Sequence, residues 1–274
     1  MESSSDYITR MSYWYPLLRD LTIESDCYKC GEQFIETLKD AHFKAIESDP
    51  FRIASNLLKK YPELKRFLEK YISKWNGVFI RADKASPKDS CLGITYFLTH
   101  PLRHGLVVIP RTQYNACICI KPEAALGLIL YSERVMIMGD PSILWVRKPA
   151  VFKHEVRVFV KDAEPRLISW YYPEEPPRTK PPIIHRMDEL KKLVEKVHDK
   201  TELADFTLDI GFLGGKLKII ELTPFPTKQN PHLVDTLLFR KDFWETLKTA
   251  VSENKIIIRY PIVKQYIKEE VIEK

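Results

Sequence analysis

The chain of 274 residues is poor in glycine, with nine in total, and it contains no GxxxxGK[ST] or GxGxxG motif. It therefore lacks the glycine-rich loops with which P-loop and dinucleotide-binding proteins hold phosphate, so a phosphate site here would have to use side-chain cations. No apolar run approaches the roughly 18 residues that a membrane helix needs. The N-terminal segment MESSSDYITR has no hydrophobic signal core. We therefore expect a cytoplasmic protein with no membrane association.

Cysteine is scarce and odd in number, with five residues, which argues against a secreted disulfide framework. Cys27 and Cys30 form a CxxC motif, but no second CxxC or HxxxH completes a four-ligand zinc site. Cys117 and Cys119 alternate on an expected strand, whereas Cys91 is isolated. Structural zinc is one interpretation, and buried free thiols are the interpretation that we favour.

The overall composition is that of a folded globular protein, with 45% hydrophobic and 29% charged residues. This length allows one large domain or two modest lobes. The formal net charge of +6 is compatible with an anionic ligand. It is too small to indicate direct nucleic-acid binding by itself.

The hydrophobic pattern predicts a mixed α+β fold with an antiparallel character. Helices are expected at 31–47, 52–73 (as one or two helices, with Pro62 in a first turn), 188–200 and 234–251. Strands are expected at 78–82, 106–109, 116–120, 126–131, 134–138, 143–147, 155–161, 166–172, 206–210 and 216–222. The stretch YYPEEPPRTKPPII holds five prolines and predicts a loop, which serves either as a lid or as a connector.

Two acids face one another in the expected hairpin DFTLDIGFLGGKLKIIELTPF. If the hairpin is centred on Gly215, Asp209 lies directly opposite Glu221 on one face of the sheet. Two adjacent carboxylates are destabilising unless a cation lies between them, and they suit Mg²⁺. Thr223 projects the same way and adds a hydroxyl. The alternative is a solvated hairpin face in another register.

Cations occur on three other segments. Arg81 and Lys88 flank the loop in GVFIRADKASPKDS, and ILWVRKP supplies Arg147 and Lys148. In KHEVRVFVKD, Arg157 shares a strand face with an acid and an aromatic residue, and it could pair with phosphate in a bidentate manner. Cations on some segments and acids on others are the balance that a metal–polyphosphate site needs.

Six segments in order make the chain resemble the cell-division-cycle protein 123 family, a divergent branch of the ATP-grasp superfamily. The resemblance covers most of the chain. The segments are YWYPLLRDLTIES, VFIRADKASPKDS, ILWVRKP, HEVRVFVKD, FTLDI with KIIELTPF, and VDTLLF.

This resemblance implies an α+β ATP-grasp fold with two lobes, mostly antiparallel sheets and a helical N-terminal region, which holds Mg-ATP. The corresponding divisions are a helical region at 1–76, a small lobe at 77–145, a large lobe with the metal site at 146–255 and a charged tail at 256–274. The implied ATP contacts come from Arg81, Lys88, Asp89, Arg147, Lys148 and Arg157. The implied Mg²⁺ ligands are Asp209, Glu221 and Thr223, the last standing where the family has Asn.

The resemblance also implies a role as a cytoplasmic assembly chaperone that binds the gamma subunit of translation initiation factor two. The alternatives are an ATP-grasp ligase, which joins a carboxylate to an amine, and a protein that binds its partner without nucleotide. Other departures from the family pattern are Tyr131-Ser132-Glu133 in place of Lys-Ser-Ser and Ser169-Trp170-Tyr171-Tyr172 in place of Ser-Gln-Arg-Asp. No nucleophile system stands out, so catalytic residues stay unassigned.

Overall fold

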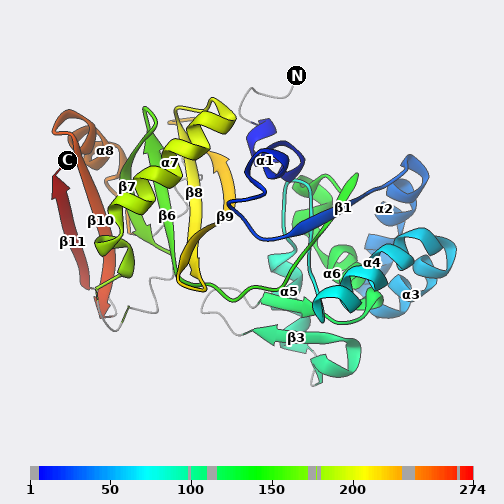
Figure 1. Cartoon of the computed structure of the whole chain (residues 1–274). Coiled ribbons are helices and arrows are strands. Elements are labelled where there is room, and N and C mark those ends of the chain that lie inside the picture. The colour runs from blue at the N-terminus through cyan, green and yellow to red at the C-terminus, as the bar shows by residue number, and fades with distance from the viewer. Residues whose placement is uncertain are drawn as a thin grey trace. The chain divides into compact units, whose positions relative to one another are not determined.

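The structure of the protein is a computed structural model that describes residues 6–97, 100–109, 116–171, 177, 180–229, 238–263 and 266–273. The chain divides into two compact units, drawn together in Figure 1. Unit 1 comprises Met1–Thr9, Tyr13–Ile23 and Ala150–Lys274. Unit 2 comprises Arg10–Ser12 and Glu24–Pro149. Each unit is built from segments that are distant in the sequence.

Unit 2 combines two small antiparallel sheets with a group of helices. Its strands are β1 (Ser25–Lys29), β2 (Phe79–Ala82), β3 (Leu106–Ile109), β4 (Ala116–Cys119) and β5 (Ile143–Arg147), arranged as β1-β5-β2 and β3-β4. Its helices are α2 (Glu32–Glu47), α3 (Pro50–Lys60), α4 (Pro62–Trp75), α5 (Lys88–Phe97), η2 (Pro101–His104), α6 (Pro122–Tyr131) and η3 (Val135–Gly139). Helices of the expected region 1–76 share one hydrophobic core with β2, β5 and α6.

Local sequence explains the boundaries of the helices in unit 2. The side chain of Asp49 caps α3 by accepting hydrogen bonds from the first-turn amides, and Pro50 begins that helix. Pro62 begins α4, as expected, and Asn76 ends it in the left-handed conformation with a φ of 56°. The helices predicted at 31–47 and 52–73 are therefore confirmed, the second as two helices.

Two strands predicted in this part of the chain are wrong. Residues 126–131 belong to helix α6, and residues 134–138 lie mostly in the π-helical turn η3. Every residue from Ala124 to Leu130 is buried, because α6 lies in the middle of the core and contacts α2, α3 and α4. A helix that is apolar on all sides has no amphipathic period, so its sequence resembles that of a buried strand.

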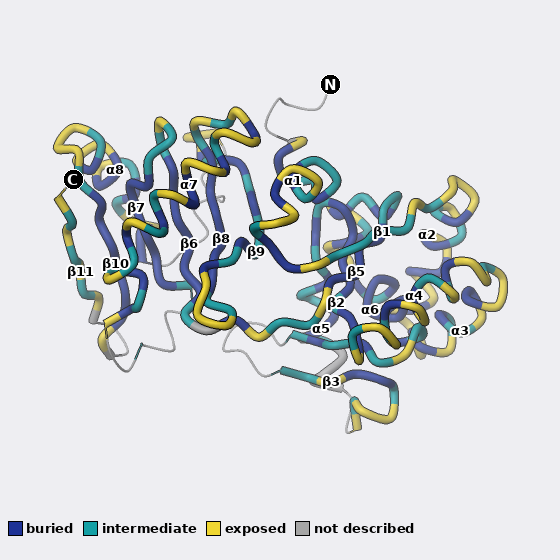
Figure 2. The backbone as a smooth tube through the Cα atoms, viewed as in Figure 1, coloured by how far each residue is buried: buried dark blue, intermediate teal, exposed yellow. Residues whose placement is uncertain are grey.

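Unit 1 is built on a six-stranded sheet with the order β11-β10-β7-β6-β8-β9. Its strands are β6 (Lys153–Lys161), β7 (Glu164–Trp170), β8 (Phe206–Leu213), β9 (Lys216–Pro224), β10 (Lys255–Val263) and β11 (Tyr266–Glu273). Every pair of neighbours is antiparallel except β10 and β7, which are parallel. Figure 2 shows that the central strands β6, β7 and β8 are largely buried.

Helices pack on this sheet, and they explain why its central strands are apolar on both faces. Helix α7 (Met187–Thr201) lies across one face and contacts β7 (Figure 1). Helix α8 (Phe243–Ser252) packs against Phe159, Leu167 and Ile257 of the sheet. Unit 1 also contains η1 (Asp6–Thr9), most of α1 (Met11–Leu18), and η4 (Pro182–His185).

The C-terminal part of unit 1 differs from expectation. Residues 256–274, expected as a charged tail, form most of β10 and the edge strand β11. Alternating charged residues on β11 resemble a tail because only its inner edge is paired. The helix expected at 234–251 begins at Phe243, since Leu238–Asp242 form turns, and residues 234–237 lie outside the described residues. Most of the proline-rich stretch at 171–184 also lies outside them.

The remaining expected elements are present. The helix predicted at 188–200 is α7, and the other eight predicted strands correspond to β2 to β9. No helix within the described part of the chain is both long and apolar enough to cross a membrane.

Candidate functional site

One residue from each strand of the unit 1 sheet lies in a single polar row. Reading across the sheet, direct register partners join β11, β10, β7, β6, β8 and β9. The members of this polar row are Glu269, Arg259, Ser169, Arg157, Asp209 and Glu221. Register partners point to the same face of a sheet, so all six side chains share one face.

The centre of the polar row is a buried ion pair between Arg157 and Asp209. Arg157 Nε donates to Asp209 Oδ1 at 2.7 Å, and Nη2 donates to Oδ2 at 2.8 Å. The two side chains are only 8% and 6% exposed. The guanidinium also lies over the ring of Tyr171, with 5.4 Å between its Cζ atom and the ring centroid. This forked geometry fixes both charged groups in one orientation.

Glu221 stands directly opposite Asp209, as the sequence predicts. The hairpin turn is Gly214-Gly215, whose positive φ angles of 58° and 77° are those of a type I′ turn. Because the strands flank two turn residues, the hairpin is centred between these glycines and not on Gly215. A β-bulge between Asp209 and Ile210 then shifts the register by one residue and restores the expected pairing.

Thr223 lies two residues beyond Glu221 and pairs with Thr207 on β8. It therefore shares the face of the two carboxylates and is partly exposed. Carboxylate and hydroxyl oxygens are hard donors that suit Mg²⁺, and an ionised carboxylate has further lone pairs beyond the two that Arg157 uses. The described residues contain no group of three or more Asp, Glu, His or Cys side chains placed to hold a metal ion. A metal held by Asp209 and Glu221 would thus need other oxygens, such as those of phosphate and water.

Two of the expected cations share one face of the β1-β5-β2 sheet in unit 2. Arg81 pairs with Trp145, and Arg147 pairs with Phe79 and with Ser25. Both arginines are buried, on the face opposite to the one that enters the hydrophobic core. Arg147 Nε donates to Ser25 Oγ at 3.4 Å, and Arg81 Nε donates to the carbonyl of Ala82 at 3.1 Å.

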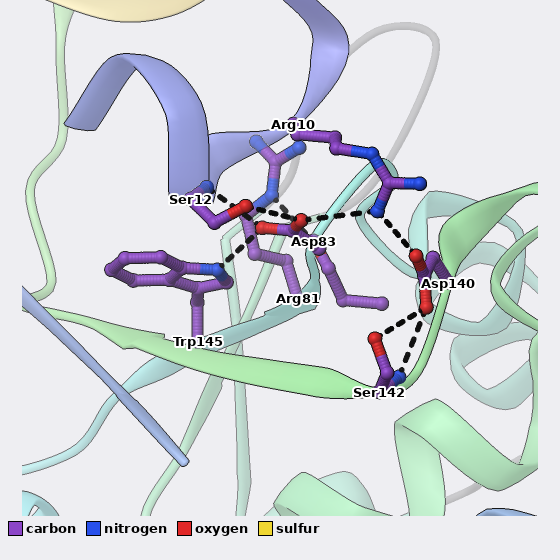
Figure 3. A network of polar contacts seen from close by, with 8 residues as sticks. Arg10, Ser12, Arg81, Asp83, Asp140, Ser142 and Trp145 are labelled. Carbon is purple, nitrogen blue, oxygen red and sulfur yellow. Dashed lines mark hydrogen bonds and ion pairs between the residues drawn. The ribbon is translucent and has the colours of Figure 1, made fainter. Parts of the chain in front are cut away.

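A buried acid that the sequence analysis does not single out organises the neighbourhood of Arg81. Asp83 is fully buried and accepts hydrogen bonds from the Ser12 amide at 2.8 Å, Ser12 Oγ at 2.6 Å and Trp145 Nε1 at 2.9 Å. Figure 3 shows Arg10 reaching between Asp83 and Asp140, with which it forms ion pairs. The network holds the side chain of Trp145 beside Arg81 on the neighbouring strand.

Asp140 completes this network from the turn after η3. It has a positive φ of 51°, and its carboxylate accepts hydrogen bonds from Ser142 N at 3.2 Å and Ser142 Oγ at 2.5 Å. Burial alone raises the pKa of Asp140, but the hydrogen bonds from Ser142 and Arg10 outweigh it, so the pKa lies below its ordinary value. The carboxylate is therefore ionised at neutral pH and anchors Arg10.

The remaining sequence-predicted residues of unit 2 have different surroundings. Lys88 begins helix α5 and is partly exposed. Asp89 follows it and accepts hydrogen bonds from Ser132 Oγ at 2.6 Å and from the Arg134 amide at 3.0 Å, so its carboxylate is engaged by its own chain. Lys148 is exposed at the end of β5, and its amide donates to the Glu24 carbonyl at 2.9 Å.

The expected site residues thus form two groups, each within one unit. Arg157, Asp209, Glu221 and Thr223 lie together on the unit 1 sheet. Arg81 and Arg147 lie together in unit 2, which also contains Lys88, Asp89 and Lys148. The departures Ser169 and Tyr171 contribute to the first group, as a register partner of Arg157 and as its stacking ring.

The five cysteines are thiols and not disulfides, in agreement with the favoured interpretation. Cys30 packs against the core of unit 2, whereas Cys27 lies on the opposite face, paired with Trp145. Burial raises the pKa of the Cys30 thiol to about 12. Cys91, Cys117 and Cys119 are buried in the same core. The CxxC spacing therefore does not bring its two thiols to one side of the strand.

Comparisons with known proteins agree with this architecture. A family described as an ATP-grasp domain, the third family of its clade, matches residues 127–240. The structure of Cdc123 from Schizosaccharomyces pombe is similar with a TM-score of 0.58 and 18% sequence identity, covering 91% of this chain and 94% of that one. Its C-terminally truncated form gives a TM-score of 0.57 and 18% identity, with coverage of 91% and 93%. No curated protein sequence matches.

These matches confirm the expected fold class, an α+β arrangement with mostly antiparallel sheets. The family match spans α6 to the start of the turn before α8, and so includes Arg157, Asp209 and Glu221. The chain is therefore a divergent ATP-grasp protein whose fold is similar to that of Cdc123.

Proposed function

We propose that this protein binds Mg-ATP and uses it as a structural ligand while it assists the assembly of translation initiation factor two, through the gamma subunit, in the cytoplasm. The observation that carries the nucleotide part is the direct pairing of Asp209 with Glu221 beside the buried Arg157 in an ATP-grasp sheet. The partner rests on the resemblance of the sequence segments to the cell-division-cycle protein 123 family and on the similarity in fold.

The residues of unit 1 fit a magnesium ion that is shared with phosphate. Arg157, Asp209 and Glu221 carry a formal net charge of −1, because one cation accompanies two carboxylates. A magnesium ion normally takes one or two protein carboxylates and completes its octahedron with phosphate oxygens and water. We assign Asp209 and Glu221 as its ligands, with the Thr223 hydroxyl as a weaker donor. When bound, the ion would neutralise charge on the phosphates of the nucleotide.

The residues of unit 2 fit the recognition of phosphate by side-chain cations. We assign phosphate contacts to Arg81 and Arg147, whose guanidinium groups are held on one sheet face. Buried arginines remain charged because their pKa is far above neutral, so they provide fixed positive charge. Lys88 and Lys148 are assigned as further contacts, whereas Asp89 supports the loop through Ser132 and Arg134.

Calorimetric titration with ATP, with and without Mg²⁺, tests the nucleotide assignment. We expect micromolar binding that requires Mg²⁺. The double variant Asp209→Asn with Glu221→Gln should abolish the Mg²⁺-dependent part while the far-UV spectrum and melting temperature stay close to those of the wild type. Affinity that is unchanged in the double variant would overturn the metal assignment, and no binding at millimolar ATP would leave protein binding as the function.

A pulldown with the gamma subunit tests the assembly role. We expect capture that is stronger with Mg-ATP than without nucleotide, and weaker capture by the double variant. Release of phosphate from ATP that depends on an added carboxylate and amine would instead indicate an ATP-grasp ligase. Capture that is equally strong with and without nucleotide would indicate a partner-binding protein in which ATP has no structural role.

A further inference from the structure

We infer that Arg157 is a built-in counter-cation of the proposed metal site, which neutralises Asp209 in the ligand-free protein and disfavours a bare metal ion. This inference deepens the proposed function, because the coupling to nucleotide rests on Mg-ATP as the ligand. It assigns Arg157 a role that differs from a simple phosphate contact. The same guanidinium would oppose one ligand and favour the other.

The geometry of the ion pair supports this role. The two bonds from Arg157 to Asp209 are 2.7 and 2.8 Å long, and both partners are almost fully buried. Asp209 and Glu221 are direct cross-strand partners, whose Cβ atoms lie about 4.5–5.5 Å apart. Two carboxylates at this separation repel one another, so the adjacent guanidinium stabilises the sheet in the absence of metal.

A divalent ion bound by Asp209 and Glu221 would lie close to the same guanidinium. Like charges a few Å apart repel by several kcal/mol at the effective dielectric constants of protein sites. Arginine cannot relieve this repulsion by losing a proton, because its pKa is above 12. A metal ion that arrives alone must therefore compete with Arg157 for Asp209. A metal ion that arrives with a triphosphate brings anionic oxygens to which the guanidinium can turn.

The surroundings of Arg157 allow it to keep its position while its partner changes. The guanidinium lies 5.4 Å from the ring centroid of Tyr171, a contact that is independent of Asp209. On β7, Arg157 faces the small side chain of Ser169, which is fully buried. We expect these two neighbours to hold the side chain near the site whether its charge is directed at Asp209 or at phosphate.

Titration with Mn²⁺ in the absence of nucleotide, followed by calorimetry, tests the inference directly. Arg157→Gln removes the charge but keeps an amide that can donate to Asp209. We expect it to bind Mn²⁺ at least about tenfold more tightly than the wild type. Arg157→Lys keeps the charge and should bind Mn²⁺ as the wild type does. Arg157→Met is the second neutral variant, to be used if the glutamine variant does not fold.

Arg259 offers a matched control, because it is the other arginine of the polar row and also pairs with carboxylates. It lies three strands from Asp209, or about 14 Å at the usual strand spacing. Arg259→Gln should leave the Mn²⁺ affinity within about twofold of the wild type. A tightening equal to that of Arg157→Gln would overturn the inference, since it would show a general effect of net charge.

The same variants, titrated with ATP in the presence of Mg²⁺, give the second half of the test. Arg157→Gln should weaken ATP binding by about tenfold or more, opposite in sign to its effect on Mn²⁺. If Mn²⁺ binds no more tightly to the neutral variants than to the wild type, the inference fails, even where Mg-ATP binding holds. If Mn²⁺ binding tightens as expected but the wild type binds no ATP, the counter-cation stands and the proposed nucleotide function fails.

Discussion

Asp83 accepts a hydrogen bond of 2.9 Å from the indole of Trp145, which lies 62 residues away in the sequence. The same carboxylate accepts two hydrogen bonds from Ser12 and forms an ion pair with Arg10. One buried acid thus joins the segment Arg10–Ser12 to β5, in a part of unit 2 that contains Arg81. The stability of unit 2 should therefore depend on this carboxylate.

Asp83→Asn should destabilise the protein strongly. The variant removes the charge that faces Arg10 and directs amide hydrogens at groups that are themselves donors. Breaking a buried charged network in this way costs about 3–5 kcal/mol, and urea unfolding followed by tryptophan fluorescence measures it. The control is Asp140→Asn, which removes a 29% exposed partner of Arg10 and should cost about 1 kcal/mol or less. Equal losses in the two variants would contradict the central role of Asp83.

The ion pair between Arg259 and Asp242 predicts a pH dependence of the stability of the protein. Hydrogen bonds from Arg259 to both carboxylate oxygens, at 2.7 and 2.8 Å, lower the pKa of Asp242. A group whose pKa is lower in the folded state stabilises that state fully above its unfolded pKa, which is about 4 for Asp. The stabilisation is lost as the pH falls from about 4 through the folded pKa.

Urea unfolding at several pH values measures this dependence. The free energy of unfolding of the wild type should fall below pH 4 more steeply than that of Asp242→Asn, which lacks the titrating group. Asp242→Asn should also be less stable than the wild type at pH 7, where the ion pair is complete. Parallel pH profiles for the two proteins would count against this assignment.

The hairpin glycines predict a position-specific effect on stability. Gly214 and Gly215 both have positive φ angles, which residues with a Cβ atom adopt at a cost of about 1–2 kcal/mol. Replacement of either glycine by Ala should lower the stability by about that amount. Replacement by Asn should cost less, because Asn tolerates this conformation in type I′ turns. Chemical denaturation of the four variants gives the comparison.

Gly31 is the control for the hairpin variants. It begins α2 with an ordinary φ of −73°, and no atom lies within 4 Å of the place where a Cβ would be added. Gly31→Ala should therefore change the stability by only a few tenths of a kcal/mol. A hairpin variant with an equally small effect would indicate that the turn differs from type I′.

The cysteines predict selective reactivity towards alkylating reagents. Cys27 is partly exposed, and partial burial together with Asp26 raises the pKa of its thiol. The Cys30 thiol has a pKa of about 12, and burial also raises the pKa of Cys119. Iodoacetamide at pH 8 should modify Cys27 slowly and first, and mass spectrometry of peptides identifies the site. Cys27→Ser should abolish this early modification, whereas rapid labelling of Cys30 would contradict its burial.

The hairpin that carries Asp209 and Glu221 can be predicted because its information is local. Alternating residues and the Gly-Gly pair specify two strands and a turn without reference to the rest of the chain. The β-bulge at Asp209–Ile210 has no comparable signal, and the sequence predicts the pairing through a hairpin centre that differs by half a residue. The fork from Arg157 to Asp209 depends on β6 lying beside β8, which single-strand patterns do not specify.

Other features escape prediction for identifiable reasons. Asp83 draws its partners from Ser12 and Trp145, which are 71 and 62 residues away. Strand β1 has the polar sequence SDCYK and is not predicted, because it is an edge strand with no clear apolar alternation. Helix α6 is predicted as a strand, because burial on all sides removes the helical period.

The discontinuous composition of unit 1 has a consequence for the order in which the chain can fold. The hydroxyl of Thr22 donates to the carbonyl of Ile219 at 2.6 Å, so this contact joins residues 197 positions apart. During synthesis, residues 24–149 leave the ribosome before β6 to β11 exist, and they can bury their own core first. The segment Tyr13–Ile23 must meanwhile wait for its partners. A nascent chain that stalls before β9 would therefore expose this early segment, which makes it a natural recognition point for chaperones.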